Sequence, residues 1–277
     1  MQAGAPTSGG TAMAAAPHAL PAAAAVRSGF DLAGKIALVT GGGSGLCRAI
    51  AWGLACHGAD VAILDRDETA ARASAQEIAA GSGRQAAAFV ADVADEASVA
   101  AAVAAAEARF GRIDVLLNGA GHNIRKPMVQ FSQPDFDSLL HVHVRGAFLM
   151  CRAVAPGMQR RGGGTIINIA SVAALVGMPE IAAYAAAKGA VLQLTRAFAL
   201  EVAAAGIRVN AIAPGFIDTP LTRQRSVESR KAFETATPLR RFGRPEELIG
   251  PAVFLASDAS SFVTGSALIV DGGWTAQ

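Results

Sequence analysis

The sequence predicts a single α/β domain in which helices cover both faces of a doubly wound, seven-stranded parallel sheet. From residue 35 onward, short runs of apolar and β-branched residues alternate with longer stretches of helical character. Runs that are apolar along their whole length are typical of parallel strands buried on both faces. The alternation continues to residue 271 without a polar linker, and 52% of the 277 residues are hydrophobic, enough for one large core.

Each predicted strand is a short apolar run that ends at a glycine, an aspartate or another turn-forming residue. The first run, KIALVT, stops at Gly41, and the second, DVAILD, stops at Asp65. The strands are expected at 35–40, 60–65, 85–92, 113–120, 165–171, 208–214 and 266–271.

The stretches between the strands carry apolar residues at helical spacing and are rich in alanine, a strong helix former. Helices are expected at 49–57, 67–80, 95–110, 135–160, 181–205 and 245–257, with 135–160 as one long helix. The crossovers should be right-handed, and a ligand of such a sheet binds beyond the carboxyl ends of the strands, where the strand order reverses.

Residues 1–28 differ in composition from the rest of the chain. Ala, Gly, Pro and Ser dominate there, and large apolar side chains are almost absent. Such a segment cannot bury enough surface to offset its ordering entropy. Its first cation, Arg27, follows the alanine-rich part, which is the reverse of the order in a signal peptide. We therefore expect a disordered tail over 1–28 and one domain over 29–277.

The charge balance argues against nucleic acid and membrane surfaces as partners. With 24 Lys and Arg against 22 Asp and Glu, the formal net charge is only +2. The cysteines Cys47, Cys56 and Cys151 form no CxxC pair and no metal-ligand spacing, and no run of about 18 apolar residues occurs. A sparse, odd set of cysteines suits a reducing compartment. We expect a cytoplasmic protein that holds no metal and acts on a small molecule.

A glycine-rich turn, TGGGSGLC at 40–47, follows the first strand and opens a helix. Glycines there let the backbone approach a pyrophosphate, and the helix N-terminus offers free N–H groups. Asp65 lies 24 residues after Gly41, at the end of the second strand. Its carboxylate can accept hydrogen bonds from both ribose hydroxyls of NAD and would repel the 2′-phosphate of NADP. The sequence thus predicts a Rossmann-type NAD site, with the alternative that Asp65 only caps the next helix.

Two further strand ends fit the same site. Asp92 ends the third strand and, with Val93, is placed to flank the adenine. The sequence NGAG at 118–121 ends the fourth strand, where small residues leave room for a cofactor.

Ser171, Tyr184 and Lys188 form the candidate catalytic group. Ser171 ends the fifth strand, Tyr184 follows by 13 residues, and Lys188 lies four residues further on, so that Tyr and Lys share one helix face. A phenol with a pKa of about 10 is a poor base at neutral pH, but a nearby ammonium and the positive nicotinamide of NAD⁺ favour the phenolate. Tyr184 can then be the base in alcohol oxidation and the acid in ketone reduction, while Ser171 holds the substrate oxygen.

Together these motifs resemble the short-chain dehydrogenase/reductase family. The resemblance covers residues 32–275 and rests on TGGGSGLC, Asp92, NGAG, Ser171, YAAAK from Tyr184, APGFIDT from Ala213 and VDGG from Val270. It implies that Lys188 binds the nicotinamide ribose and lowers the pKa of Tyr184, that 214–219 line the nicotinamide, and that a substrate lid spans about 216–242. It also implies a homotetramer. The residues then expected to bind the cofactor are Gly41, Ser44, Gly45, Leu46, Asp65, Asp92, Val93, Asn118, Ala120, Tyr184, Lys188, Pro214, Gly215, Ile217 and Thr219.

Two positions depart from the family pattern. Cys47 replaces the third glycine of the turn, so we expect its side chain to crowd the helix against the sheet or the cofactor. Its thiol, at a helix N-terminus, is expected to have a lowered pKa. His143 stands where the family usually has an Asn that holds a water next to the Lys. The helical pattern points its ring inward, where it either bonds the same water as a fourth catalytic residue or is a buried histidine without a chemical role.

Positive charge near the expected substrate site favours a small polyhydroxylated substrate, with a sugar acid ahead of a neutral polyol. The lid carries six cations against three acids, and Arg125 closely follows the fourth strand. Arg can clamp a carboxylate, and His122 and Glu180 can meet hydroxyls. The stretch GHNIRKP at 121–127 is similar to the corresponding stretch of gluconate 5-dehydrogenases. The alternative is that the lid cations form a solvated helix face.

The leading interpretation is an NAD-dependent enzyme that interconverts a secondary alcohol and a ketone, and two other functions stay open. A 3-oxoacyl-carrier-protein reductase would use NADPH and dock its carrier through arginines, but this chain has Leu149 and Leu200 at the corresponding positions. An NAD-binding sensor or scaffold without turnover is favoured by Cys47 and His143. The intact Ser171, Tyr184 and Lys188 argue against it.

Overall fold

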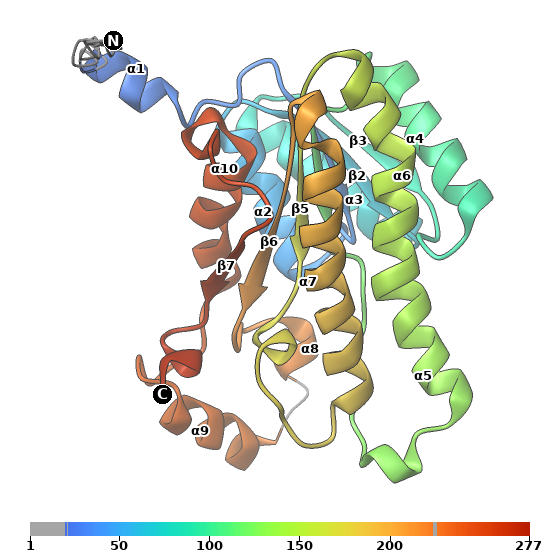
Figure 1. Ribbon diagram of the computed structural model, residues 1–277, viewed down its shortest axis with the longest axis vertical. Coiled ribbons are helices and arrows are strands. Elements are labelled where there is room, and N and C mark those ends of the chain that lie inside the picture. The colour runs from blue at the N-terminus through green and yellow to red at the C-terminus, as the bar shows by residue number, and fades with distance from the viewer. Residues whose placement is uncertain (1–19, 21, 224–225) are drawn as a thin grey trace, which may run out of the picture.

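The centre of the structure is a seven-stranded sheet in the order β3-β2-β1-β4-β5-β6-β7, in which every neighbouring pair is parallel. The structure is a computed structural model that describes residues 20, 22–223 and 226–277 (Figure 1). The strands are β1 (Ile36–Thr40), β2 (Asp60–Asp65), β3 (Ala86–Val90), β4 (Val115–Asn118), β5 (Gly164–Ile169), β6 (Ile207–Pro214) and β7 (Ala267–Val270). The predicted fold class is confirmed.

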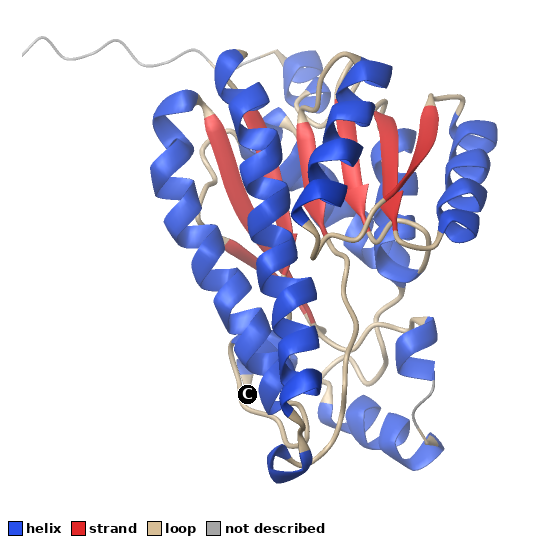
Figure 2. Ribbon diagram, turned by 90° about the vertical axis from the view of Figure 1, so that its right-hand side faces the viewer, coloured by secondary structure: helices blue, strands red, loops and turns tan. Residues whose placement is uncertain are grey.

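Alternate side chains of the central strands enter two large cores, one on each face of the sheet, and a smaller cluster surrounds Ala211 and Ala213 of β6. In β1, Val39 joins one core and its neighbour Leu38 joins the other. The helices over the first core are α2 (Gly45–Cys56), α3 (Glu68–Ser82) and α10 (Ile249–Ala256), and those over the second are α4 (Glu96–Phe110), α6 (Gly146–Arg160) and α7 (Ala182–Val202). Figure 2 shows the strands as one twisted layer with helices on both sides. Because both faces are covered, the strands are mostly apolar, and polar side chains within them such as Asn168 and Asn210 are buried.

The helices begin and end at residues whose chemistry suits the caps. Asp67 and Asp95 accept hydrogen bonds from backbone N–H groups three residues further on, at the N-termini of α3 and α4. Gly83 and Gly111 end the same helices with φ values of 69° and 83°, a left-handed conformation that glycine adopts at low cost. The chain therefore turns back toward the next strand without a long loop.

The helix expected over 135–160 is interrupted. Helix α5 (Gln133–Leu140) passes into a π-helical segment, His141–Arg145, before α6 begins. A π-helical turn is wider than an α-helical turn, and such turns are frequent at functional sites. This segment contains His143.

Part of the segment expected to be disordered is helical. Helix α1 (Ala23–Ser28) has no buried residue, and its alanines have high helix propensity. The following residue, Gly29, accepts a hydrogen bond from the backbone N–H of Ala259 at 2.9 Å. The structure thus describes Ala23–Ser28 as a helix whose residues are all exposed, and the expected disorder of 1–28 stays a prediction, of which residues 1–19 and 21 lie outside the described residues.

The segment expected to form the lid lies beyond the carboxyl edge of the sheet, where Figure 1 places α8 (Pro220–Arg223) and α9 (Val227–Ala236). The ring of Phe216 lies against that of Phe233, with centroids 3.9 Å apart. Trp274 meets Phe216 edge-on at 5.5 Å. This aromatic cluster joins the lid to the turn that follows β7.

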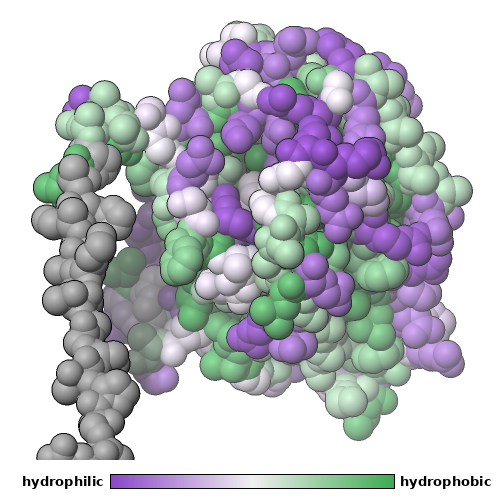
Figure 3. Space-filling model, turned by 45° about the horizontal axis from the view of Figure 1, so that its top comes forward, coloured by the Kyte–Doolittle hydropathy of each residue, from purple (hydrophilic) through white to green (hydrophobic). Residues whose placement is uncertain are grey.

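The opposite edge of the sheet, where the strands begin, is polar. Lys35, Arg112, Asp114 and Arg161 line a depression there, and Figure 3 shows polar side chains over much of this end of the molecule. Within the described ranges, no helix has the length and apolar character needed to cross a bilayer.

Candidate active site

A cleft of about 380 Å³ lies at the carboxyl edge of the sheet, beside the ends of β1, β2 and β4. The strand order reverses here, because the chain continues from β1 to β2 on one side and β4 lies on the other. The hydroxyl of Thr40, the last residue of β1, accepts hydrogen bonds from the backbone N–H groups of Gly119 at 2.9 Å and Ala120 at 3.2 Å. The end of β4 is therefore held against the glycine-rich turn.

Close approach of the backbone explains the glycines of this turn. Gly41 has a φ of 68°, and a Cβ there would lie 2.9 Å from the Cα of Ala120. A Cβ on Gly43 would lie 2.9 Å from Oδ2 of Asp65. The backbone N–H of Gly43 donates to that same oxygen at 3.0 Å. The turn thus holds the Asp65 carboxylate in the wall of the cleft.

The structure brings most of the residues expected to bind the cofactor to this cleft. Those that line it are Gly41, Ser44, Gly45, Leu46, Asp65, Asp92, Val93, Ala120 and Thr219. Asn118 and Lys188 line a small adjoining cavity. Tyr184 and Gly215 line the neighbouring, larger cavity described below.

Three residues lie elsewhere than expected. Pro214 ends β6, and the buried Ile217 lines a separate small cavity, so neither side chain lines the cleft. His122, expected in the substrate site, lines the cofactor cleft instead. Partial burial, and then the charge of Arg66, lowers the pKa of His122. Arg66 itself lines the cleft without having been predicted there, although its place beside Asp65 could have indicated it.

Cys47 packs into a space that Gly119 leaves open. A Cβ on Gly119 would overlap with Sγ of Cys47, so the glycine makes room for the thiol. Cys47 also lines the cleft, and the expected crowding of the helix or the cofactor stays a prediction. The thiol is buried, and burial raises the pKa of Cys47 to about 12, although the charge of Lys188 acts in the opposite direction. The predicted lowering of this pKa is wrong, because burial outweighs the effect of the helix N-terminus.

Ser171, Tyr184 and Lys188 converge beyond the end of β5. Lys188 is 4% exposed, and its Nζ donates to the carbonyl oxygen of Ile169 at 2.7 Å. Tyr184, one turn earlier on α7, has its ring centroid 5.7 Å from that Nζ. The phenol oxygen of Tyr184 is hydrogen-bonded to the hydroxyl of Ser171, and Oγ of Ser171 also accepts from the backbone N–H of Ala173 at 3.1 Å. The three predicted side chains form one group.

Burial moves the pKa values of Tyr184 and Lys188 in opposite directions. It raises the pKa of Tyr184 to about 12, while the hydrogen bond with Ser171 acts to lower it. It lowers the pKa of Lys188 to about 8, so the ammonium is still mostly protonated at pH 7. The lowered Tyr184 pKa expected from the sequence is therefore not a property of the chain alone, because burial outweighs the hydrogen bond with Ser171.

His143 points inward, as predicted, and is 5% exposed. Its Nε2 lies 2.7 Å from the carbonyl oxygen of His122. Because a carbonyl can only accept, Nε2 carries the proton and Nδ1 is left as an acceptor. This Nδ1 is buried and has no hydrogen-bond partner in the described structure. A Cβ on Gly121 would overlap with the imidazole ring, so this glycine makes room for it.

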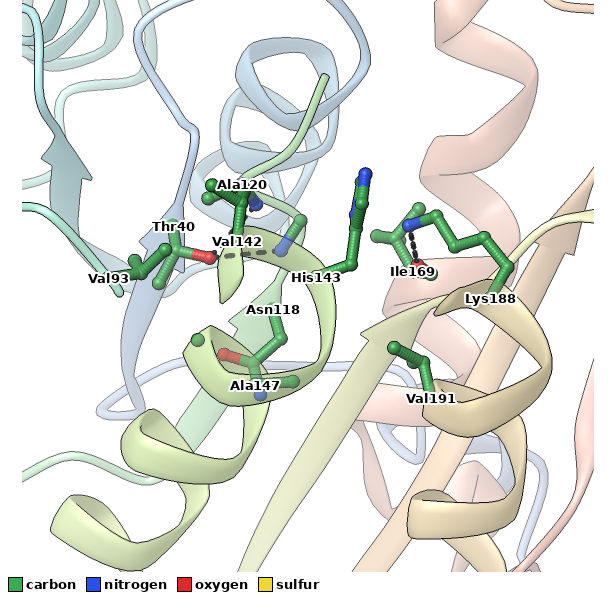
Figure 4. A pocket seen from close by; sticks show the side chains of 12 residues that line it. Thr40, Val93, Asn118, Ala120, Val142, His143, Ala147, Ile169, Lys188 and Val191 are labelled. Carbon is green, nitrogen blue, oxygen red and sulfur yellow. Dashed lines mark hydrogen bonds between the residues drawn. The ribbon is translucent and has the colours of Figure 1, made fainter. Parts of the chain in front are cut away.

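A cavity of about 10 Å³, roughly the size of one water molecule, separates His143 from Lys188. Figure 4 shows the two side chains approaching each other from the π-helical segment and from α7. The ring of His143 also stands edge-on to that of Tyr184, with centroids 5.4 Å apart. Burial, and then the charge of Lys188, lowers the pKa of His143 to about 3. The imidazole is therefore neutral at pH 7.

A second cavity, of about 480 Å³, adjoins Ser171 and Tyr184 and reaches the lid. Arg125 and Glu180, both predicted for the substrate site, lie in its wall and form an ion pair of 3.1 Å. Met178 and Ser229 also line it. Sequence reasoning missed both, because only the folded loop and lid bring them to this cavity.

The cations of the lid do not line this cavity in the described structure. Arg223 and Arg230 pair with Asp218, and Arg241 pairs with Glu247. Arg225 lies outside the described residues. The alternative of a solvated, internally paired lid surface fits these contacts better than a cationic substrate clamp.

Comparisons with known proteins agree with the fold and the motifs. A family profile described as enoyl-(acyl carrier protein) reductase matches residues 41–275. The chain is 42% identical over 247 residues to the D-threitol dehydrogenase of Mycolicibacterium smegmatis, covering 89% of this chain and 95% of the relative. It is 37% identical over 242 residues to the 3-oxoacyl-[acyl-carrier-protein] reductase of Thermotoga maritima, covering 87% and 98%.

A solved structure of a dehydrogenase has the same fold as this chain. The gluconate 5-dehydrogenase of Burkholderia cenocepacia, in complex with NADP and tartrate, aligns with a TM-score of 0.87 and 42% identity, covering 91% of this chain and 99% of that one. The chain belongs to the short-chain dehydrogenase/reductase family. It is an oxidoreductase that acts on a secondary alcohol group and binds a nicotinamide cofactor.

The neutral, buried state of His143 predicts a pH-dependent stability. The pKa is about 3 in the folded chain and about 6.5 in an unfolded one. Unfolding therefore takes up a proton between these values, so stability is complete above pH 6.5 and is lost as the pH falls toward 3. Acidification from pH 7.5 to pH 5 should lower the free energy of unfolding of the wild type. The decrease should be about 2 kcal/mol larger than the decrease in His143→Asn.

Urea denaturation at both pH values measures this difference. His141→Asn is the matched control, because His141 lies in the same π-helical segment but is exposed. The control should respond to pH as the wild type does. An identical pH response of all three proteins would show that His143 is not held neutral by the fold.

Proposed function

We propose that the chain is an NAD(H)-dependent dehydrogenase that interconverts a secondary alcohol and a ketone on a small polyhydroxylated compound, with Tyr184 as the general acid and base. The observation that carries the proposal is the grouping of Ser171, Tyr184 and Lys188, of which the first two line the larger cavity and Lys188 lines the water-sized one. The cleft suits a dinucleotide. The glycines of its turn carry no side chains, so the backbone can approach a pyrophosphate, and Asp65 is held in the wall where a ribose would bind. Bound there, a nicotinamide cofactor supplies or accepts a hydride.

The reaction also needs a proton, and the chain's own residues handle it. In ketone reduction the Tyr184 phenol, protonated at neutral pH, donates its proton to the substrate oxygen. The hydroxyl of Ser171 holds that oxygen as negative charge develops on it. In alcohol oxidation the phenol oxygen must take the proton, which requires a lower pKa. The Lys188 ammonium and the positive charge of bound NAD⁺ both act in this direction.

His143 completes the proposed group as a positioning residue. Its unpartnered Nδ1 and the charged Lys188 face the same water-sized cavity. A water there would accept from the ammonium and donate to Nδ1, giving the buried charge a second partner besides the carbonyl of Ile169. The water would link Lys188 to His143, in place of the family's usual Asn.

The proposed preference for NAD rests on Asp65. Its carboxylate lines the cleft, and the N–H of Gly43 holds it in place at 3.0 Å. A 2′-phosphate beside this carboxylate would be repelled. Arg66, in the same wall, is the feature that favours a phosphate, and the related gluconate 5-dehydrogenase structure contains NADP. The Asp65 carboxylate lies in direct hydrogen-bond contact with the turn, so we give its charge the greater weight.

Two other functions have weaker support. A carrier-protein reductase is represented among the relatives. In this chain Leu200 is 82% exposed where the resemblance would place a docking arginine, whereas Leu149 is buried and does not bear on docking. A sensor without turnover was suggested by Cys47 and His143. Both pack beside glycines that make room for them, and the Tyr184 group is intact.

Replacement of Asp65 tests the cofactor proposal. In the wild type we expect kcat/KM to be higher with NAD than with NADP, and Asp65→Ser should narrow the ratio by about tenfold or more, because the repelling charge is gone. Steady-state kinetics with both cofactors measures the ratio. Equal or better use of NADP by the wild type would contradict the proposal.

Replacement of Tyr184 tests the acid–base assignment. Tyr184→Phe keeps the ring and its contacts but has no proton to transfer, so turnover should fall by at least about a hundredfold. NAD binding, followed by titration calorimetry, should stay nearly unchanged. A variant that keeps more than about a tenth of the wild-type kcat would show that another group transfers the proton.

We also propose a homotetramer, in line with the family resemblance. Such family members commonly pair through the long helices and the C-terminal strand. In this chain, Phe148 on α6, Leu200 on α7 and Ile269 on β7 are apolar and exposed by 46%, 82% and 44%. Light scattering at micromolar concentration should give about four times the 28.0 kDa mass of the chain. A stable monomer would overturn this proposal.

A further inference from the structure

The substrate cavity contains one compensated pair of charges. Among its described lining residues, only Arg125 and Glu180 carry a formal charge at neutral pH. Nη2 of Arg125 lies 3.1 Å from Oε2 of Glu180, and their side chains are 33% and 51% exposed. The wall they form is therefore electrically neutral as a whole, although each group can still bond a ligand.

The backbone holds Glu180 in an uncommon conformation. Its φ is 66°, in the left-handed region that side-chain-bearing residues seldom adopt. The carbonyl oxygen of Glu180 accepts a hydrogen bond from the backbone N–H of Lys126 at 3.0 Å. The loop before α7 is thus joined to the loop after β4 by a backbone bond beside the ion pair. This double link fixes the carboxylate in the cavity wall.

The polar groups of this wall suit a ligand that can both donate and accept hydrogen bonds. The Glu180 carboxylate can only accept, and Oδ1 of Asn123, in the same wall, is a buried acceptor without a partner in the described structure. A hydroxyl can donate to such groups and accept from Arg125. A carboxylate cannot donate, and beside Glu180 it would add a second negative charge.

The nearby cation has its own partner. Lys126, next to Arg125, is bonded to Asp135 at 2.5 Å. The lid cations described above are paired as well. Among the described residues that line the cavity, Arg125 is therefore the one cation that faces the substrate, and Glu180 compensates its charge.

We infer that Glu180 is a specificity-determining residue: by pairing with Arg125 it makes the site select a neutral polyol over the corresponding sugar acid. This inference rests on the proposed function and narrows its substrate class. It reverses the order expected from the sequence, in which the uncompensated arginines of the lid favoured an acid.

The test compares two substrate pairs that differ only at one terminal carbon, D-threitol with D-threonate and D-glucitol with D-gluconate. The wild type should have the higher kcat/KM for each polyol. In Glu180→Gln, which keeps the side-chain size and removes the charge, the acid-to-polyol ratio of kcat/KM should rise by about fivefold or more. In Arg125→Gln, which leaves Glu180 uncompensated, the ratio should fall.

The double variant and a remote control separate charge from structure. Glu180→Gln combined with Arg125→Gln restores neutrality, so its ratio should return toward that of the wild type. Glu96→Gln removes the same kind of carboxylate from an exposed pair with Arg152 outside the cavity, and should leave the ratio unchanged. If both single variants lower kcat/KM equally for acids and polyols, the pair is only structural and the inference fails. A wild type that prefers the acids also overturns it.

Binding of tartrate provides a readout that does not need turnover. This dicarboxylate has the four-carbon skeleton of threitol, and the Kd for its binding to the NAD-loaded protein can be measured by calorimetry. Glu180→Gln should bind tartrate about fivefold or more tightly than the wild type does. Absence of any oxidation by the wild type, together with this gain in tartrate affinity, would refute the proposed function but support charge selection by Glu180. Unchanged tartrate affinity with active polyol oxidation would refute the selection alone.

Discussion

The bond between the Lys188 ammonium and the carbonyl oxygen of Ile169 is the interaction on which the active site depends. A buried ammonium is costly unless it is paired, and this bond ties α7 to the end of β5 at 2.7 Å. Tyr184 lies one turn earlier on the same face of α7. Its phenol is therefore brought to Ser171, which lies two residues after the end of β5. A shift of α7 along β5 would separate the phenol from Ser171 and leave the charge unpaired.

The segment 118–121, at the end of β4, makes room for both side chains that depart from the family pattern, Cys47 and His143. Cys47 packs beside Gly119, and His143 packs beside Gly121, where a Cβ would overlap with each. Thr40 holds this segment by accepting from the N–H of Gly119. The segment after β4 therefore does more than leave space for a cofactor: it also receives a buried thiol and a buried imidazole. Both groups stay uncharged at neutral pH, with Cys47 at a pKa of about 12 and His143 at about 3.

Features that repeat within one element could be predicted from the sequence, whereas those created by contacts between elements could not. The apolar runs defined all seven strands, and the i, i+4 spacing placed Tyr184 and Lys188 on one face. The π-helical segment around His143 has no periodic signature. The pKa of Tyr184 and that of Cys47 shift with burial, which requires the packed structure. The sequence also does not indicate that His122 lines the cleft, because its loop has no regular structure to fix the direction of its side chain.

The residues proposed for proton transfer and those proposed for substrate selection also differ in whether they lie on one element or on two. Lys188 and Tyr184 lie on a helix packed against the sheet, so their geometry is determined by the core. Arg125 and Glu180 are 55 residues apart on two loops and meet only at the cavity wall. Loops tolerate substitution better than the core because fewer buried contacts depend on them. A change at either residue of the ion pair would therefore alter the charge of the cavity wall and leave the group formed by Ser171, Tyr184 and Lys188 in place.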